Sequence, residues 1–416
     1  MLEELIEKGK KARGAAAFLR TVSSAEKNKV LTGAAGRLEI NLDRLLEANH
    51  LDIVAAEKND IKGAFLDRLK LNTGRVKSMA DGLRELAALP DPVGEVVSMV
   101  KRPNGLMIGK QRVPIGVIGI IYESRPNVTA DAFGLCLKTG NATVLRGGKE
   151  AIHSNLAILD VLQEALVDRG FPGDAVQVVE NTSRESARDM MRMNGYLDLL
   201  IPRGGQGLIK TVVENSSVPV IETGVGNCHV FVDNQADQEK AIAIAVNAKT
   251  HRPGVCNAAE TLLIHTGIAA PFIPAVCKAM AEKGVEIRGD ETVCRYWPEA
   301  VPATKDDWAK EYLDLILAVR VVGSLDEAVQ HISRYGTGHS EAIVTENYSK
   351  AQAFLAKVDA AAVYVNASTR FTDGYEFGFG AEIGISTQKL HARGPLGLKE
   401  LTSTKYIIYG NGQIRE

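Results

Sequence analysis

The sequence has no excess of charge of either sign. Lys and Arg number 49 and Asp and Glu number 51 among 416 residues, which leaves a net charge of −2. Proteins that bind nucleic acid or an acidic membrane surface usually carry a basic excess. The balance therefore argues against both kinds of partner.

Long apolar runs and metal-binding motifs are also missing. No apolar run reaches the ~18 residues that a membrane helix needs, and residues 1–13 interleave Glu and Lys, unlike a signal peptide. We therefore expect a cytoplasmic protein. The five cysteines contain no Cys-x-x-Cys pair, and the eight histidines no His-Glu-x-x-His run. We expect neither a disulfide framework nor a metal site, so a functional cysteine should act as a thiolate.

Aromatic residues are sparse, at 5%, whereas glycine is frequent, with 39 residues. This composition favours an α/β enzyme with many tight strand-to-helix turns over a β-sandwich. A chain of this length is expected to form two or three domains of ~150 residues each.

Hydrophobic periodicity gives a coarse map of the chain. The first ninety residues are predicted to be helical, because Ser23 and Glu26 have capping-box spacing, apolar residues then recur at helical period, and Pro90 ends the region. Two short strands are predicted within residues 93–112, joined at the turn signal Asn104-Gly105.

From residue 113 onwards, apolar strands and amphipathic helices alternate. Such alternation predicts parallel sheets with helices on both faces. Predicted strands cover residues 115–122, 142–145, 176–179 and 197–201 in a first run, residues 261–264, 317–322, 342–344 and 361–365 in a second, and residues 406–409 at the end. We therefore expect two α/β domains, the second beginning after Cys256, and a small β element.

Glycine-rich turns follow two of the predicted strands, at residues 146–149 and 203–207. Ligands of parallel sheets bind beyond the carboxyl ends of the strands, where such turns lie. Neither turn has the Walker spacing or the Gly-x-Gly-x-x-Gly pattern. A nucleotide site and ordinary tight turns therefore both remain open.

A series of motifs nevertheless resembles one family. The order of residues 113–119, Thr139-Gly140-Asn141, Glu222-Thr223-Gly224 and a later cysteine is similar to that of aldehyde dehydrogenases. Within that superfamily the chain resembles the γ-glutamyl phosphate reductases. The motifs that carry this closer resemblance are residues 122–127, 145–150, 201–205, 252–257, 331–332, 339–341, 365–370 and 386–395.

This resemblance covers essentially the whole chain and implies a fold. It implies an α/β, aldehyde dehydrogenase-like architecture of two Rossmann-like parallel-sheet domains and a small β oligomerisation element. The NADP-binding domain would comprise residues 1–95 and 113–255, the catalytic domain residues 256–385, and the oligomerisation element residues 96–112 and 386–416.

The resemblance also implies an activity and partners. The activity is the NADPH-dependent reduction of L-glutamyl 5-phosphate to L-glutamate 5-semialdehyde and phosphate, the second step of proline biosynthesis. Because no kinase region precedes Met1, we expect the free-standing bacterial form. We further expect a homo-oligomer, a dimer or a tetramer, because apolar edge strands normally find a partner. Association with glutamate kinase is a further expectation.

Cys256 is the expected nucleophile. A thiolate is the most nucleophilic side chain near neutral pH, and its attack on an acyl phosphate gives a cysteinyl thioester. An isolated cysteine is more often a buried apolar residue. The position of Cys256 after Arg252-Pro253-Gly254, together with the resemblance, favours the catalytic interpretation.

The resemblance assigns three further residues to the reaction centre. Asn127 is the candidate donor to the oxyanion, or else it caps the helix after Pro126. Glu222 stands where hydrolytic relatives keep a general base; here it either helps Cys256 lose its proton or only packs near the nicotinamide. Glu311 is expected to hold the nicotinamide ribose hydroxyls, the alternative being a solvated helix carboxylate.

Arginine forks suit the carboxylate and the phosphate of the substrate. Arg125, Arg252 and Arg370 lie within the family motifs and are the candidates, and His391 and Arg393 are weaker ones. A surface charge is the alternative for any single arginine.

The cofactor is expected to be NADP. Lys149 stands where NAD-using relatives commonly carry an acid, and a cation there would attract the 2′-phosphate. Arg146 adds a second cation, and Gly204 and Gly205 complete the candidate cofactor residues. The alternative is that Lys149 only faces solvent.

Two other functions were weighed against this one. An ordinary NAD(P)-dependent aldehyde dehydrogenase that oxidises a small aldehyde would favour Lys at position 146 and Glu at position 149. A catalytically silent scaffold would not need Cys256, Glu222 or Glu311.

Overall fold

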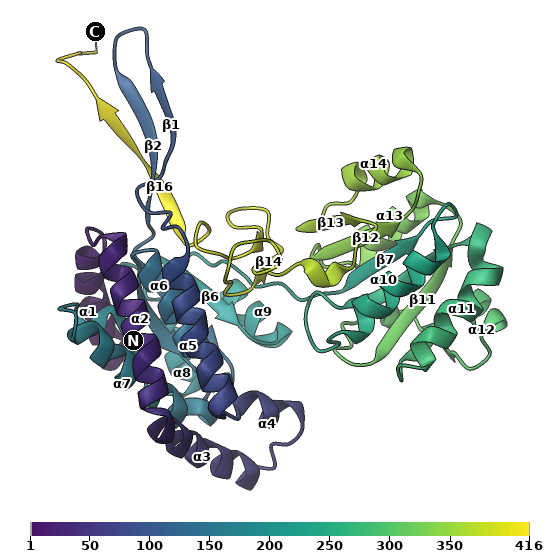
Figure 1. Cartoon of the computed structure of the whole chain (residues 1–416), viewed down its shortest axis with the longest axis horizontal. Coiled ribbons are helices and arrows are strands. Elements are labelled where there is room, and N and C mark those ends of the chain that lie inside the picture. Colours follow the sequence, from purple (N-terminus) through teal and green to yellow (C-terminus); the bar gives the residue numbers. More distant parts are fainter. Residues whose placement is uncertain (1, 416) are drawn as a thin grey trace. The chain divides into compact units, whose positions relative to one another are not determined.

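The computed structural model describes residues 2–415, which form two compact units (Figure 1). The first unit comprises residues 2–222, 378–384 and 396–415, and the second comprises Thr223–Phe377 and Ile385–Pro395. No helix in the described part of the chain combines the length and apolarity needed to cross a membrane.

A layer of helices opens the first unit, as the periodicity predicts. Ser23 and Glu26 form the predicted capping box: the Ser23 hydroxyl accepts from the Glu26 amide, and the Glu26 carboxylate accepts from the Ser23 amide. The last helix of the layer ends just before Pro90. The helices are α1 (Glu3–Leu19), α2 (Ser24–Ile40), α3 (Leu42–Lys58), α4 (Ala64–Leu69) and α5 (Thr73–Ala88).

A four-stranded parallel sheet forms the core of the first unit. Its strand order is β5-β4-β3-β6. The chain enters the sheet at β3, adds β4 and β5 on one side, and then crosses back to add β6 on the other side of β3. Every residue of β3 is buried, as expected of a strand covered on both faces. The elements are β3 (Val117–Tyr122), α6 (Asn127–Lys138), β4 (Ala142–Arg146), α7 (Ile152–Val167), β5 (Val176–Val178), α8 (Arg184–Met190), β6 (Leu199–Arg203) and α9 (Gln206–Asn215).

The second unit is built on a seven-stranded parallel sheet with the order β10-β9-β11-β8-β7-β12-β13. Its largest apolar cluster packs α10 and α11 against the central strands. The strands are β7 (Cys228–Val232), β8 (Ala259–His265), β9 (Glu286–Gly289), β10 (Val301–Pro302), β11 (Ile316–Val322), β12 (Ser340–Val344) and β13 (Ala362–Val365). The helices are α10 (Gln238–Thr250), α11 (Ala269–Ala281), α12 (Glu291–Tyr296), α13 (Leu325–Tyr335) and α14 (Tyr348–Lys357).

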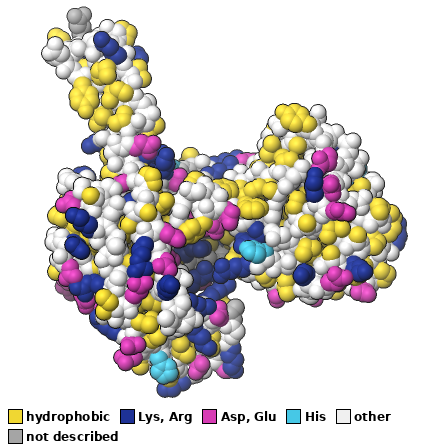
Figure 2. Space-filling model, in the orientation of Figure 1, with side chains coloured by type: hydrophobic (Ala, Val, Ile, Leu, Met, Phe, Trp, Pro, Cys, Tyr) yellow, Lys and Arg dark blue, Asp and Glu magenta, His cyan; other side chains and the backbone are white. Residues whose placement is uncertain are grey.

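Two small antiparallel sheets complete the fold. The predicted hairpin is present as β1 (Val96–Lys101) and β2 (Met107–Pro114), and β16 (Thr402–Tyr409) pairs with β2 along its whole length. These strands form an arm of the first unit, and hydrophobic side chains lie on its visible face (Figure 2). The second small sheet pairs β14 (Ile385–Ser386) with β15 (Gly394–Pro395).

The predicted domain boundaries differ from the two compact units. The second unit begins at Thr223, not at Cys256, because β7 lies between β8 and β12 in the second sheet. Residues 386–395 were assigned to the oligomerisation element but belong to the second unit, whereas β16 does join the hairpin. Apolar strand patterns resemble one another, and the pattern of β7 carries no signal for the sheet that it joins.

Candidate active site

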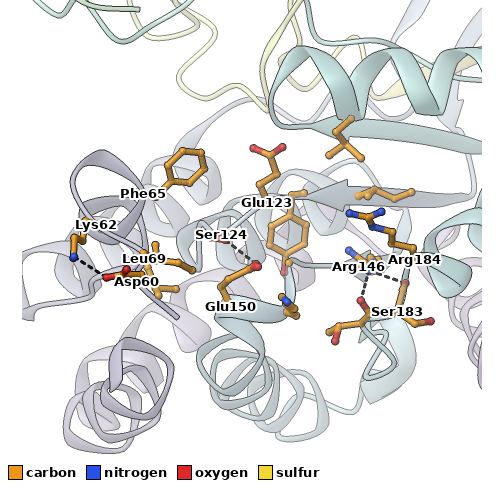
Figure 3. Close-up of a pocket in the computed structure, with 17 residues that line it drawn as sticks. Asp60, Lys62, Phe65, Leu69, Glu123, Ser124, Arg146, Glu150, Ser183 and Arg184 are labelled. Carbon is orange, nitrogen blue, oxygen red and sulfur yellow. Dashed lines mark hydrogen bonds and ion pairs between the residues drawn. The ribbon is translucent and has the colours of Figure 1, made fainter. Parts of the chain in front are cut away.

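A pocket of about 830 Å³ lies at the carboxyl ends of β3 and β4 in the first unit. Residues after β3, after β4 and at the start of α8 line it, together with part of α4 (Figure 3). Its place beside the point where the strand order reverses is where parallel sheets of this topology bind nucleotides. The two glycine-rich turns of the sequence follow β4 and β6 of this sheet.

Four cations line the pocket, of which Lys62 is paired with Asp60 at 2.6 Å. The Arg146 guanidinium donates to the carbonyl oxygens of Thr182 (2.6 Å) and Ser183 (2.9 Å), while its Nε is buried without a partner. Lys149 is exposed and begins a short 3₁₀ turn. Arg184, at the start of α8, lies beside Arg146 in Figure 3. This donor set suits a phosphate group.

Arg184 was not predicted as a pocket residue. It lies far along the chain from Arg146, in a stretch whose only sequence signal is that of a helix start. Two hydrogen bonds from Arg146 to the carbonyl oxygens of Thr182 and Ser183 hold the turn before α8, and thereby Arg184, beside the pocket.

The turn after β4 packs closely against buried side chains. A Cβ at Gly147 would lie 2.2 Å from the Asn155 amide nitrogen and 3.2 Å from the Tyr122 ring, so a side chain there would force both groups to shift. Gly204 follows β6 and packs against Glu123, and Gly205 precedes α9 as its N-cap. Neither Gly204 nor Gly205 is among the described residues that line the pocket, although Leu208 of α9 is.

Cys256 lies in the loop between α10 and β8 of the second unit, as its sequence context predicts. The loop is at the amino end of β8, not at the carboxyl end where parallel sheets usually bind their ligands. Cys256 is half-buried, whereas Cys136, Cys228 and Cys277 are buried. Burial raises the pKa of the Cys136 and Cys277 thiols to about 12, so these thiols are inert at neutral pH.

The backbone of Cys256 rests on Gly226. A Cβ at Gly226 would lie 1.5 Å from the Cys256 carbonyl oxygen and 2.7 Å from its Cα, so only glycine permits this approach. The Gly226 amide donates to Glu311 Oε1 at 2.8 Å. Glu311 lies outside any helix, so the alternative of a solvated helix carboxylate is wrong. Burial raises the pKa of Glu311, and the bond from Gly226 lowers it.

A buried network lies behind the loop of Cys256. The Cys228 thiol donates to the Cys256 carbonyl oxygen at 3.2 Å and lies 3.8 Å from His339 Nδ1. His339 Nδ1 is 2.8 Å from the Ser340 hydroxyl, which contacts that of Thr372. Cys228 begins β7, and burial raises the pKa of its thiol well above the ordinary value.

Arg370 is tied to the same loop through its backbone. The Asn257 amide donates to the carbonyl oxygens of Arg370 (3.3 Å) and Thr372 (2.9 Å). Burial and the Arg252 cation lower the pKa of Arg370, whereas the charge of the Cys256 thiolate raises it. Arg370 Nε is buried without a partner. Arg370 therefore interacts electrostatically with both Arg252 and Cys256 and has an unused donor, an arrangement suited to an anion.

Three further predicted site residues belong to the first unit. Asn127 is the first residue of α6, and its amide donates to Asp131 Oδ2 at 2.9 Å. Its side chain does not cap the helix, so the capping alternative is wrong. Arg125 lies in the turn before α6, and Glu222 is the half-buried last residue of the main segment of this unit.

The weaker candidates His391 and Arg393 lie between β14 and β15. Arg393 is paired with Asp359 at 2.8 Å, so its charge already has a partner. The backbone carbonyl of His391 accepts from the Gln388 amide at 2.8 Å.

Comparison with known proteins gives three findings. The model of the aldehyde dehydrogenase family matches residues 3–293. The γ-glutamyl phosphate reductases of Carboxydothermus hydrogenoformans and Moorella thermoacetica are each 62% identical to this chain, over 414 and 413 residues, and the matches cover 99–100% of every chain involved. The crystal structure of the γ-glutamyl phosphate reductase of Thermotoga maritima is similar with a TM-score of 0.98 and 52% identity, over 100% of both chains.

Proposed function

The chain belongs to the γ-glutamyl phosphate reductases of the aldehyde dehydrogenase family, and on this premise we propose that it reduces L-glutamyl 5-phosphate with NADPH. The products are L-glutamate 5-semialdehyde, phosphate and NADP. This reaction is the second step in the synthesis of proline from glutamate. The observation that carries the proposal is the full-length match to relatives of this name at 62% identity.

Cys256 is proposed to carry the covalent step. Its thiolate attacks the carbonyl carbon of the acyl phosphate, a C–S bond forms, and the C–O bond to phosphate breaks with both electrons leaving on phosphate. The product of this step is a thioester. NADPH supplies, when bound, the hydride that reduces this thioester. The product of hydride transfer is a thiohemiacetal oxyanion, and its collapse re-forms the carbonyl as the C–S bond breaks, which releases the aldehyde and the Cys256 thiolate.

Two further roles, donation to the oxyanion and removal of the Cys256 proton, are proposed from the positions that these residues share with the family motifs. The Cys256 amide and the Asn127 side chain are proposed as donors to the developing oxyanion, for which each good donor contributes a few kcal/mol, roughly 3. Asn127 must then exchange its bond to Asp131 for one to the substrate. Glu222 is proposed either to take the proton of Cys256 or to pack near the nicotinamide.

Two arginines beside Cys256 are proposed to bind the substrate. Arg370 and Arg252 act on each other electrostatically, and Arg370 has a buried donor without a partner. Charged groups of this kind form strong, directional hydrogen bonds to phosphate and carboxylate. Arg125 of the first unit is proposed as the third anion ligand.

NADP is proposed to occupy the pocket of the first unit. Lys149, Arg146 and Arg184 line it and would hold the adenosine 2′-phosphate. Gly204 and Gly205, at the start of α9, would let the backbone approach the pyrophosphate. Glu311 is proposed to bind the nicotinamide ribose; its Oε1 accepts from Gly226, which leaves Oε2 for this role.

We propose that the chain forms a homo-oligomer through the arm of the first unit. All six residues of β1 are exposed, and Val97, Val100, Tyr406 and Ile408 are each more than half exposed. Apolar edge strands of this kind normally pair with another copy. Association with glutamate kinase is proposed from the family alone, because an unstable acyl phosphate favours direct transfer between enzymes.

The test is the reverse reaction. NADP reduction in the presence of glutamate semialdehyde should require inorganic phosphate, because phosphate must release the acyl group from Cys256. An ordinary aldehyde dehydrogenase, the alternative function, releases the acid by hydrolysis and needs no phosphate. Phosphate-independent reduction would therefore replace the proposal with that alternative.

A further inference from the structure

A buried ion pair flanks the loop of Cys256. Lys249 lies in the last turn of α10, before the loop, and Glu260 lies in β8, after it. Both side chains are 0% exposed, and Lys249 Nζ is 2.6 Å from Glu260 Oε2. Removing two charges from water is costly, and apolar side chains often fill such a site with equal stability. Stability alone therefore does not account for the pair.

The second oxygen of Glu260 holds a strained segment. Glu260 Oε1 accepts from the Leu313 amide at 3.1 Å. Leu313 has φ +56°, in the left-handed region that a non-glycine residue adopts only where its surroundings fix it. The ring of the preceding residue, Tyr312, faces Lys249 Nζ at 5.9 Å, and its hydroxyl donates to Asp307 at 2.7 Å.

This segment continues to the nucleophile. Glu311, two positions before Leu313, accepts from the Gly226 amide, and Gly226 packs against the carbonyl group of Cys256. A continuous chain of contacts therefore runs from Lys249 through Glu260, the segment 311–313 and Gly226 to Cys256.

We infer that Lys249 and Glu260 are positioning residues for the nucleophile. The pair fixes the segment 311–313, Glu311 fixes Gly226, and Gly226 sets the position of the Cys256 backbone. The inference rests on the proposed role of Cys256. Burial raises the pKa of Glu260 to about 7 and lowers that of Lys249, and each charge favours the charged form of the other. Glu311 and Asp314 are the further carboxylates that act on this pair.

Two double variants separate positioning from stability. Lys249→Met/Glu260→Gln removes both charges but keeps an oxygen that can accept from Leu313. Lys249→Met/Glu260→Leu removes the charges and that acceptor. Neither leaves an unpaired charge in the core, so both should fold. The matched control is Lys27→Met/Asp91→Leu, which removes a buried pair of the first unit (2.5 Å).

Two quantities are measured for each variant. The first is the rate at which iodoacetamide alkylates Cys256 in the folded protein as a function of pH, quantified on the Cys256 peptide after digestion. The second is kcat. The Gln variant should keep both values within about threefold of wild type, and the Leu variant should lose at least about tenfold in kcat, because an ångström-scale shift of a reacting group has such effects. The Leu variant should also shift the pH profile of alkylation upward, as Cys256 moves relative to Arg370. The control should change neither readout by more than about twofold.

Equal kcat and equal alkylation profiles in the Gln and Leu variants would overturn the inference, whatever their melting temperatures. A failure of the proposed function has a different signature. In that case wild-type Cys256 would be alkylated no faster than the same peptide in urea, and the positioning role would be overturned with it.

Discussion

Replacing Gly226 by alanine should disable the nucleophile without unfolding the protein. The new Cβ would lie 1.5 Å from the carbonyl oxygen of Cys256 and 2.3 Å from its carbonyl carbon. Both are backbone atoms, so no side-chain rotation can relieve the clash. Ordinary carbon contacts lie at about 3.5–4.0 Å, so one of the two segments must move by more than about 1 Å. Neither segment is free to yield, because Glu311 holds the Gly226 amide and Cys228 donates to the Cys256 carbonyl.

The magnitude follows from that displacement. A misplacement of about 1 Å can cost about 10²-fold in rate, whereas overpacking costs roughly 1–3 kcal/mol of stability. We therefore expect kcat of Gly226→Ala to fall by about 10²-fold and the melting temperature by only a few degrees. The assay is NADP reduction with glutamate semialdehyde and phosphate, alongside thermal unfolding.

The control for this variant is Gly36→Ala in α2, where a Cβ meets open space. Alanine in a helix interior should add roughly 0.5–1 kcal/mol of stability and leave kcat unchanged. A Gly226→Ala enzyme with kcat within about twofold of wild type would refute the reasoning, because a displaced Cys256 cannot retain that rate.

Four further predictions follow from the structure. Cys256→Ser should reduce turnover to below a few per cent of wild type with unchanged cofactor affinity, and a higher residual rate would exclude the thioester. Lys149→Glu should lower the NADPH over NADH preference in kcat/KM by about ten- to hundred-fold, mainly through KM; an unchanged ratio would remove Lys149 from the cofactor site. Sedimentation should give a homo-oligomer at micromolar concentration that Val100→Asp in β1 dissociates, and a wild-type monomer would contradict the proposed role of the arm. Burial lowers the pKa of His331 to about 3 and of His339 to about 4 from 6.5, so the unfolded chain binds more protons below pH 6.5. Stability should therefore fall as the pH decreases from 6.5, by roughly 2 kcal/mol per histidine at about pH 5; equal urea midpoints at about pH 5 and 7.5 would contradict it.

The local architecture was predictable because it depends on neighbours in the sequence. The capping box at Ser23 and the hairpin at Asn104-Gly105 are both where local patterns place them. The same patterns could not place β7, since the sheet that a buried strand joins is decided by packing against distant strands.

The site was predictable only in part, for the same physical reason. Motif resemblance predicted Cys256, Arg370 and Arg252 as site residues, and in the structure Arg370 interacts electrostatically with the other two. It missed Arg184, Gly226 and the pair Lys249–Glu260, whose roles arise from contacts between segments far apart in the chain. The sequence signals that could have found that pair are a glutamate within an apolar strand and a lysine at the end of an apolar helix, because neither residue is normally buried without a partner.

The central claim is that Cys256 carries the acyl group, and its capture tests this most directly. The enzyme is mixed with NADP and glutamate semialdehyde without phosphate, quenched in acid within a second, digested and analysed by mass spectrometry. We expect the Cys256 peptide to carry one glutamyl group as an acid-stable, hydroxylamine-labile thioester, which disappears when phosphate is added before the quench. NADPH formation at full rate with no adduct on Cys256, or an adduct on another residue, would contradict the account.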